Sequence, residues 1–124
     1  MEKVYIAPSA LSADFGRAAE QFKLLEESGI KYLHLDVMDG IFVPNISFGQ
    51  VVIKSLRPHT HMVFDVHLMI TEPIRYIKQF AQSGADYITV HYEACKDLKA
   101  QHSIASAENY LRRNYYWLVV SKMS

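Results

Sequence analysis

Strand-like and helix-like patterns alternate along this chain, and the alternation constrains the fold more than any other feature. Short apolar or β-branched runs are each followed by a longer stretch with helical spacing, in the order β-α-β-α-β-α-β. The predicted strands are residues 4–7, 32–38, 62–69 and 87–91, and the predicted helices are residues 12–27, 48–56 and 73–83. No hairpin signal separates the strands, so we expect parallel strands joined by helical crossovers.

The chain of 124 residues predicts a single folded unit. The pattern changes after about residue 100, where residues 101–114 are weakly helical and residues 115–120 are strongly β-like. We therefore expect a folded region over residues 1–100 and an atypical tail over residues 101–124 that is not a separate domain. Residues 115–120 are expected to pair as an extra strand that covers one edge of the sheet.

Composition and charge exclude several classes of partner. Lysine plus arginine number 13 and aspartate plus glutamate also number 13, so the formal net charge is zero. A neutral chain offers no electrostatic basis for binding nucleic acid or an anionic membrane. No run approaches the roughly 20 apolar residues of a membrane helix, and the N-terminus lacks the apolar core of a signal peptide. The single cysteine, Cys95, excludes an intrachain disulfide and fits a reducing compartment, so we expect a cytoplasmic protein.

Two predicted strands carry ionisable side chains on the face opposite their apolar side chains. Side chains alternate along a strand, so His34 and Asp36 share one face of strand 32–38. Asp65 and His67 likewise share one face of strand 62–69. Burying such groups costs several kcal/mol unless they are paired or bind a cation.

Adjacent parallel strands lie about 4.8 Å apart, so His34, Asp36 and His67 can converge on one metal ion. The alternative is a set of hydrogen-bonded core groups, and the residues by themselves leave both interpretations open. His91 is the last residue of the strand over residues 87–91, and it can likewise be a core group that only pairs with a neighbouring side chain. The loop over residues 38–49 is rich in apolar residues, which suits either a cover over this site or a contact with a neighbouring subunit.

At these positions the sequence resembles the ribulose-phosphate 3-epimerase family. The matching segments are IAPSALSADF at 6–15, HLDVMDG at 34–40, FVPN at 42–45, DVHLM at 65–69, EP at 72–73 and SGAD at 83–86. Together they cover residues from about 4 to 100. The resemblance implies an α/β fold of the (β/α)8 TIM-barrel family, here only its N-terminal half, with about four βα units plus the extra C-terminal segment.

The resemblance also implies roles for particular residues. It implies one divalent metal ion, zinc or iron foremost and otherwise manganese or cobalt, held by His34, Asp36 and His67. Asp36 is also implied to be one of two catalytic acid/base carboxylates. The substrate-binding positions that it implies are Ser9, His67, Met38 and Met69.

The family's reaction converts D-ribulose 5-phosphate to D-xylulose 5-phosphate by proton abstraction at carbon 3, which implies a metal-dependent isomerase acting on a ketopentose phosphate in the pentose phosphate pathway. The family's second catalytic aspartate and its glycine-rich phosphate site lie in the later half of the barrel and are not found in this sequence. We therefore expect impaired turnover by the short chain. Two alternatives remain open: a non-catalytic half-barrel that binds metal or assembles with a partner, and an epimerase of another ketose phosphate such as allulose 6-phosphate. Exposed strand edges predict a homo-oligomer.

Overall fold

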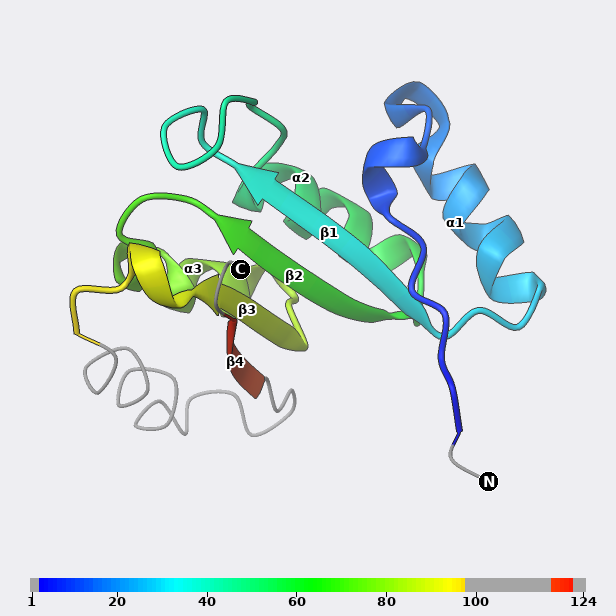
Figure 1. The fold of residues 1–124 in the computed structure, drawn as a ribbon. Coiled ribbons are helices and arrows are strands. Elements are labelled where there is room, and N and C mark those ends of the chain that lie inside the picture. Colours follow the sequence, from blue (N-terminus) through cyan, green and yellow to red (C-terminus); the bar gives the residue numbers. More distant parts are fainter. Residues whose placement is uncertain (1–2, 98–116, 122–124) are drawn as a thin grey trace.

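The computed structural model describes residues 3–97 and 117–121, which form one parallel sheet with helices along it (Figure 1). The strands are β1 (Tyr32–Met38), β2 (Val63–Met69), β3 (Tyr87–His91) and β4 (Trp117–Ser121), paired in the order β1-β2-β3-β4. The helices are α1 (Ala18–Glu27), α2 (Gln50–Leu56) and α3 (Ile77–Ser83). Short 3-10 turns lie at Ala10–Ser12, Phe15–Arg17, Arg57–His59, Pro73–Arg75 and Tyr92–Ala94. The expected parallel α/β arrangement is confirmed.

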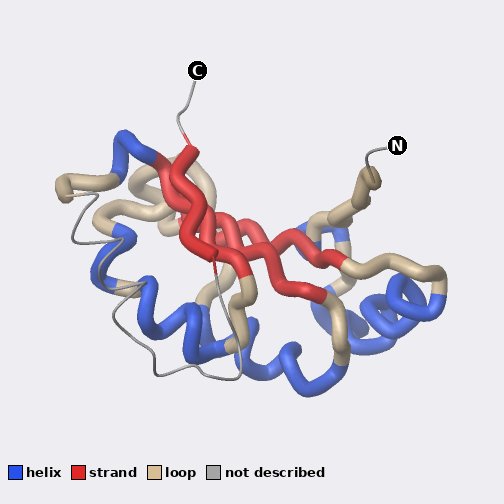
Figure 2. Tube along the Cα trace, turned by 90° about the horizontal axis from the view of Figure 1, so that it is seen from below, coloured by secondary structure: helices blue, strands red, loops and turns tan. Residues whose placement is uncertain are grey.

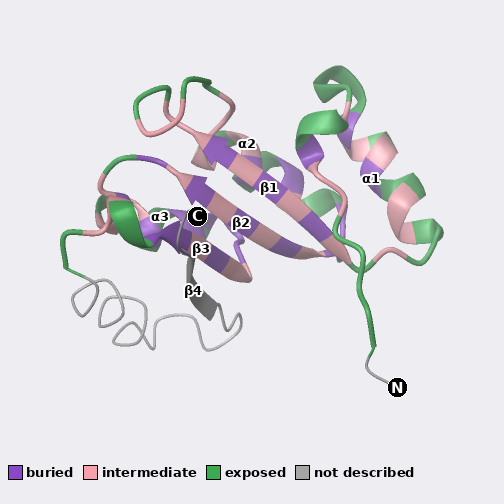
Figure 3. Ribbon diagram, in the orientation of Figure 1, coloured by how far each residue is buried: buried purple, intermediate pink, exposed green. Residues whose placement is uncertain are grey.

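The three helices lie on one side of the sheet, and no described helix lies on the other side (Figure 2). Burial alternates strictly along β1 and β2, with every second side chain fully buried against the helices (Figure 3). The largest buried side chains of this core are Phe22, Leu33, Leu35, Ile53, Phe64, Leu68, Ile77, Phe80 and Ile88. Burying each one contributes about 1.5–3 kcal/mol. The opposite face of the sheet carries half-buried side chains, among them the ionisable groups His34, Asp36, Asp65 and His67.

The segment over residues 4–7, which we expected to be the first strand, forms no strand in the structure. Val4 and Ile6 are 87% and 69% exposed. The ring of Tyr5 lies 5.1 Å from that of Tyr32 in β1, and Ser9, just after the segment, forms an isolated parallel bridge with His34. Pro8 accepts a hydrogen bond from the His34 N–H through its carbonyl, but it has no N–H of its own to continue a ladder. The prediction for residues 4–7 failed because the apolar side chains of Val4 and Ile6 do not pack into the core.

The β-like tail segment is confirmed as an additional strand. β4 pairs in parallel with β3, with Tyr87 opposite Trp117 and His91 opposite Ser121. β4 extends one residue beyond the C-terminal end of the predicted range of 115–120, and residues 115 and 116 of that range lie outside the described residues. The weakly helical stretch predicted over residues 101–114 lies outside the described residues. Among the helices that the structure does describe, none has the length and apolar character needed to span a membrane.

The side chain of Arg57 forms hydrogen bonds near the N-terminal ends of both β2 and β3. Its guanidinium donates hydrogen bonds to the carbonyls of Gly84 and Met62, at 3.3 and 2.6 Å, and to Asp86 at 3.1 Å. The same group lies 3.7 Å from the centroid of the Phe64 ring. Arg57 thus joins the end of α2, the start of β2 and the connection between α3 and β3.

Gly84 is expected to be required by this arrangement. Gly84 and Gly29 both end helices with positive φ, at 115° and 87°, but only a Cβ at Gly84 would collide with the Arg57 side chain. We expect Gly29→Ala to lower the free energy of unfolding by about 1 kcal/mol and Gly84→Ala by at least about 2 kcal/mol. Urea unfolding of both variants measures this difference, and equal losses would contradict it.

Candidate metal centre

The polar face of the sheet is built by the register of β1 and β2. In this parallel pairing Asp36 lies opposite His67, and His34 lies opposite Asp65. All four side chains are half-buried and project from the face that carries no described helix. The apolar side chains on the other face determine which side of the sheet the four ionisable side chains occupy. A one-residue slip of the register would bury those four side chains among the helices.

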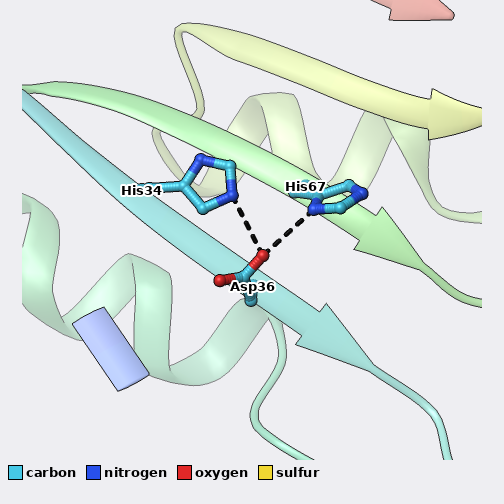
Figure 4. A group of neighbouring side chains, drawn as sticks. All are labelled: His34, Asp36 and His67. Carbon is cyan, nitrogen blue, oxygen red and sulfur yellow. Dashed lines mark hydrogen bonds and ion pairs between the residues drawn. The ribbon is translucent and has the colours of Figure 1, made fainter. Parts of the chain in front are cut away.

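One carboxylate oxygen joins the two imidazoles. Oδ1 of Asp36 lies 3.0 Å from Nε2 of His34 and 3.0 Å from Nδ1 of His67, as Figure 4 shows. One ligand atom from each of the three residues lies within 4.8 Å of the others. The structure therefore brings together the three predicted ligands, in an arrangement that could hold a metal ion.

The second ring nitrogen of each histidine also has a partner, which is what a metal site of this kind needs. Nδ1 of His34 lies 2.9 Å from a carboxylate oxygen of Asp65. Nε2 of His67 lies 2.7 Å from Nε2 of His91. Partners of this kind orient a ligating imidazole and fix which nitrogen presents its lone pair. Two imidazoles and one carboxylate are a donor set that Zn²⁺ and similar divalent ions accept, so the residues fit such an ion.

Without a metal ion, the pKa values of His34 and His91 shift in opposite directions. The hydrogen bond to Asp65 raises the pKa of His34, although partial burial opposes this. Burial lowers the pKa of His91, and the neighbouring His67 adds to the effect. Because the pKa of His34 is raised above its unfolded value near 6.5, its protonated form stabilises the metal-free chain below that pH. The contribution is lost as the pH rises through the raised pKa of His34.

The other predicted site residues lie near the cluster of His34, Asp36 and His67. Ser9 donates a hydrogen bond from Oγ to Oδ2 of Asp36 at 3.1 Å, so it contacts the oxygen that the histidines leave unused. Met38 and Met69 lie opposite each other at the C-terminal ends of β1 and β2. Both are half-buried on the polar face. Their substrate-binding roles remain predictions.

The loop after β1 places one of its apolar side chains over the centre. The ring of Phe42 lies 5.2 Å from the ring of His91, centroid to centroid. The carboxylate of Asp39 holds the loop by accepting hydrogen bonds from the N–H groups of Phe42 and Thr71. Ile41 and Ile46 remain 79% and 76% exposed. The loop is therefore a partial cover through Phe42, and a contact with a neighbouring subunit through its isoleucines stays a prediction.

Two contacts at the centre were not expected from the sequence. The bond between His91 and His67 follows from the sheet register, because Thr89 lies opposite His67 and His91 is two residues further on the same face. Ser47 donates a hydrogen bond to the carbonyl of Asp36 at 2.6 Å and so ties the loop back to β1. A serine in a loop gives no sequence signal of such a role.

A parallel α/β sheet with helices on one face and a histidine–aspartate cluster on the other defines a part of a barrel protein with a candidate metal centre. The chain belongs to the Ribulose-phosphate 3 epimerase family, which matches residues 5–109. The match extends beyond residue 100, where we expected the resemblance to end.

Several curated relatives are similar to this region. Ribulose-phosphate 3-epimerase of Synechocystis is 50% identical over 92 residues, which cover 74% of this chain and 40% of that protein. The Bacillus subtilis protein of the same name is 50% identical over 95 residues, which cover 77% of this chain and 44% of that protein. The chloroplastic ribulose-5-phosphate-3-epimerase of Arabidopsis thaliana is 48% identical over 90 residues, covering 73% of this chain and 32% of its own length. The chain thus spans less than half the length of these relatives.

Metal binding by the purified chain is expected to depend on the two clustered histidines. His34→Ala or His67→Ala should weaken binding of Co²⁺ or Zn²⁺ by about 100-fold or more, because loss of a ligand costs at least what loss of an outer partner costs. Titration followed by the visible absorption of Co²⁺, with Zn²⁺ in competition, measures the affinity. His59→Ala and His61→Ala are matched controls, because both rings are exposed outside the cluster. Unchanged affinity in the cluster variants would contradict the assignment.

Proposed function

We propose that this chain supplies the metal-binding and proton-abstracting part of a ribulose-phosphate 3-epimerase, which converts D-ribulose 5-phosphate to D-xylulose 5-phosphate. The observation that carries the proposal is the position of Asp36, whose carboxylate meets two imidazoles and a serine hydroxyl on the open face of the sheet. Family membership and the names of the relatives support the choice of reaction.

His34, Asp36 and His67 would hold one divalent ion, zinc or iron foremost and otherwise manganese or cobalt. When bound, such an ion supplies positive charge that stabilises the negative charge developing on the substrate oxygens. The match between the donors and these ions supports the proposal.

Asp36 is proposed to take the proton from carbon 3 of the sugar. A carboxylate suits this task because it can accept the proton and is held in place by neighbouring donors. Ser9 keeps Oδ2 oriented and is proposed to contact the substrate as well. Met38 and Met69 would give the reacting carbon an apolar wall that excludes water on one side.

Inversion at carbon 3 also needs a proton delivered from the opposite face of the sugar. The carboxylates of the described cluster, Asp36 and Asp65, project from neighbouring strands of one sheet and the second of them holds His34. Neither lies on an opposing wall. We therefore propose that the 124-residue chain, assayed by itself, abstracts the proton but completes epimerisation slowly.

Proton exchange at carbon 3 tests this function most directly. With Zn²⁺ or Co²⁺ at saturation in deuterated water, the chain should incorporate deuterium at carbon 3 of D-ribulose 5-phosphate. Asp36→Asn should slow this by about 10²–10⁴-fold, because it removes the base but keeps an oxygen donor. Glu27→Gln makes the same carboxylate-to-amide change on an exposed position of α1.

The outcomes of this assay separate the alternatives. Exchange without inversion supports the proposal, and no exchange by the metal-loaded chain would favour a non-catalytic half-barrel that binds metal or a partner. Faster exchange with allulose 6-phosphate than with D-ribulose 5-phosphate would favour an epimerase of another ketose phosphate.

Self-association is the expected state of the chain in solution. Val4, Ile41 and Val51 are 87%, 79% and 81% exposed, and the net charge of zero offers no repulsion between copies. Light scattering at micromolar concentration should show a homodimer or larger species, and a monodisperse monomer would contradict this. Comparing Val4→Lys with Ile41→Lys would show whether the N-terminal segment or the loop after β1 forms the contact.

A further inference from the structure

A third histidine, His91, lies beside the candidate metal centre but is not one of its three ligands. It is the last residue of β3 and is 8% exposed. Its Nε2 lies 2.7 Å from Nε2 of His67, and the two ring centroids are 4.8 Å apart. Its other nitrogen, Nδ1, is buried and has no hydrogen-bond partner among the described residues. The buried ring of His91 is therefore committed to His67.

A single hydrogen lies between Nε2 of His67 and Nε2 of His91, and either ring can be its donor. If His91 donates, His67 accepts at Nε2 and carries its own hydrogen on Nδ1, which then points at Asp36. If His67 donates from Nε2, its Nδ1 presents a lone pair toward Asp36 instead. The first arrangement suits a hydrogen bond to Asp36, and the second suits a cation between the two residues. The role of His91 as donor or acceptor thus decides what His67 offers to the centre.

His34 does not face this choice. Its outer nitrogen meets the carboxylate of Asp65, which in its ionised form can only accept a hydrogen bond. A neutral His34 therefore carries its hydrogen on Nδ1 and presents the lone pair of Nε2 to the centre. His67 has a neutral imidazole as its outer partner, so its tautomer is set by His91.

We propose that His91 is a positioning residue for metal binding, which accepts a hydrogen bond from Nε2 of His67 and so holds the lone pair of Nδ1 toward Asp36. The inference rests on the proposed metal centre and adds to it a residue that contacts no metal. The change from donor to acceptor moves hydrogens between nitrogens and leaves the number bound by the pair unchanged. Phe42 packs on the His91 ring, with the two ring centroids 5.2 Å apart.

Two amide variants of matched chemistry test this role. In His91→Gln the amide reaches the position of Nε2 and its oxygen can accept from His67, whereas in His91→Asn the shorter amide reaches the position of Nδ1 and leaves His67 without a partner. We expect His91→Asn to bind Co²⁺ and Zn²⁺ about 10–100-fold more weakly than the native chain. His91→Gln should stay within about threefold of the native affinity. Equal affinity of the two variants would overturn the proposal.

Nitrogen-15 NMR of the native chain tests the same point without a substitution. In the zinc-loaded chain His67 should carry its hydrogen on Nε2 and bind through Nδ1, and a hydrogen on Nδ1 would overturn the proposal. If His91→Asn fails to fold, this measurement on the native chain still tests the proposal. Urea unfolding of the metal-free variants separates lost stability from lost affinity. A native chain that binds neither ion would overturn the metal centre and this inference together, whereas native binding with unaffected variants would overturn the role of His91 alone.

Discussion

The parallel pairing of β1 with β2 is the constraint on which the site depends. Its register sets Asp36 opposite His67 and His34 opposite Asp65, and the pleat sends all four to one face. The apolar side chains between them fill the core under the helices, so the register cannot slip without burying charged groups. The same residues that stabilise the sheet therefore place the ligands.

A polar face of this kind is stable because its groups satisfy one another. Asp36 accepts a hydrogen bond from Ser9 and lies within hydrogen-bond distance of two imidazoles, Asp65 pairs with His34, and His91 pairs with His67. The unpartnered Nδ1 of His91 is the exception among the described residues.

The sequence was sufficient to predict β1 and β3 to the residue, because each has a strict pattern and a clear turn at its ends. It failed at residues 4–7, where the apolar side chains of Val4 and Ile6 stay exposed instead of packing into the core. The convergence of His34, Asp36 and His67 was predictable from period-two alternation on neighbouring strands. The bond between His67 and His91 was not, because it depends on the register of β2 with β3, which no local pattern specifies.

Stability and chemistry are separated along the strands. At their N-terminal ends Arg57, Asp86 and Gly84 lock backbone groups of β2 and β3 into one geometry. Further along, the side chains of the open face make hydrogen bonds mainly to each other, and Phe42 packs on His91 from a loop. Barrel proteins keep their reactive groups toward the C-terminal ends of the strands, where loops vary without loosening the sheet. The Arg57 contacts join β2 and β3 at their N-terminal ends, and the contact between His67 and His91 joins the same two strands toward their C-terminal ends.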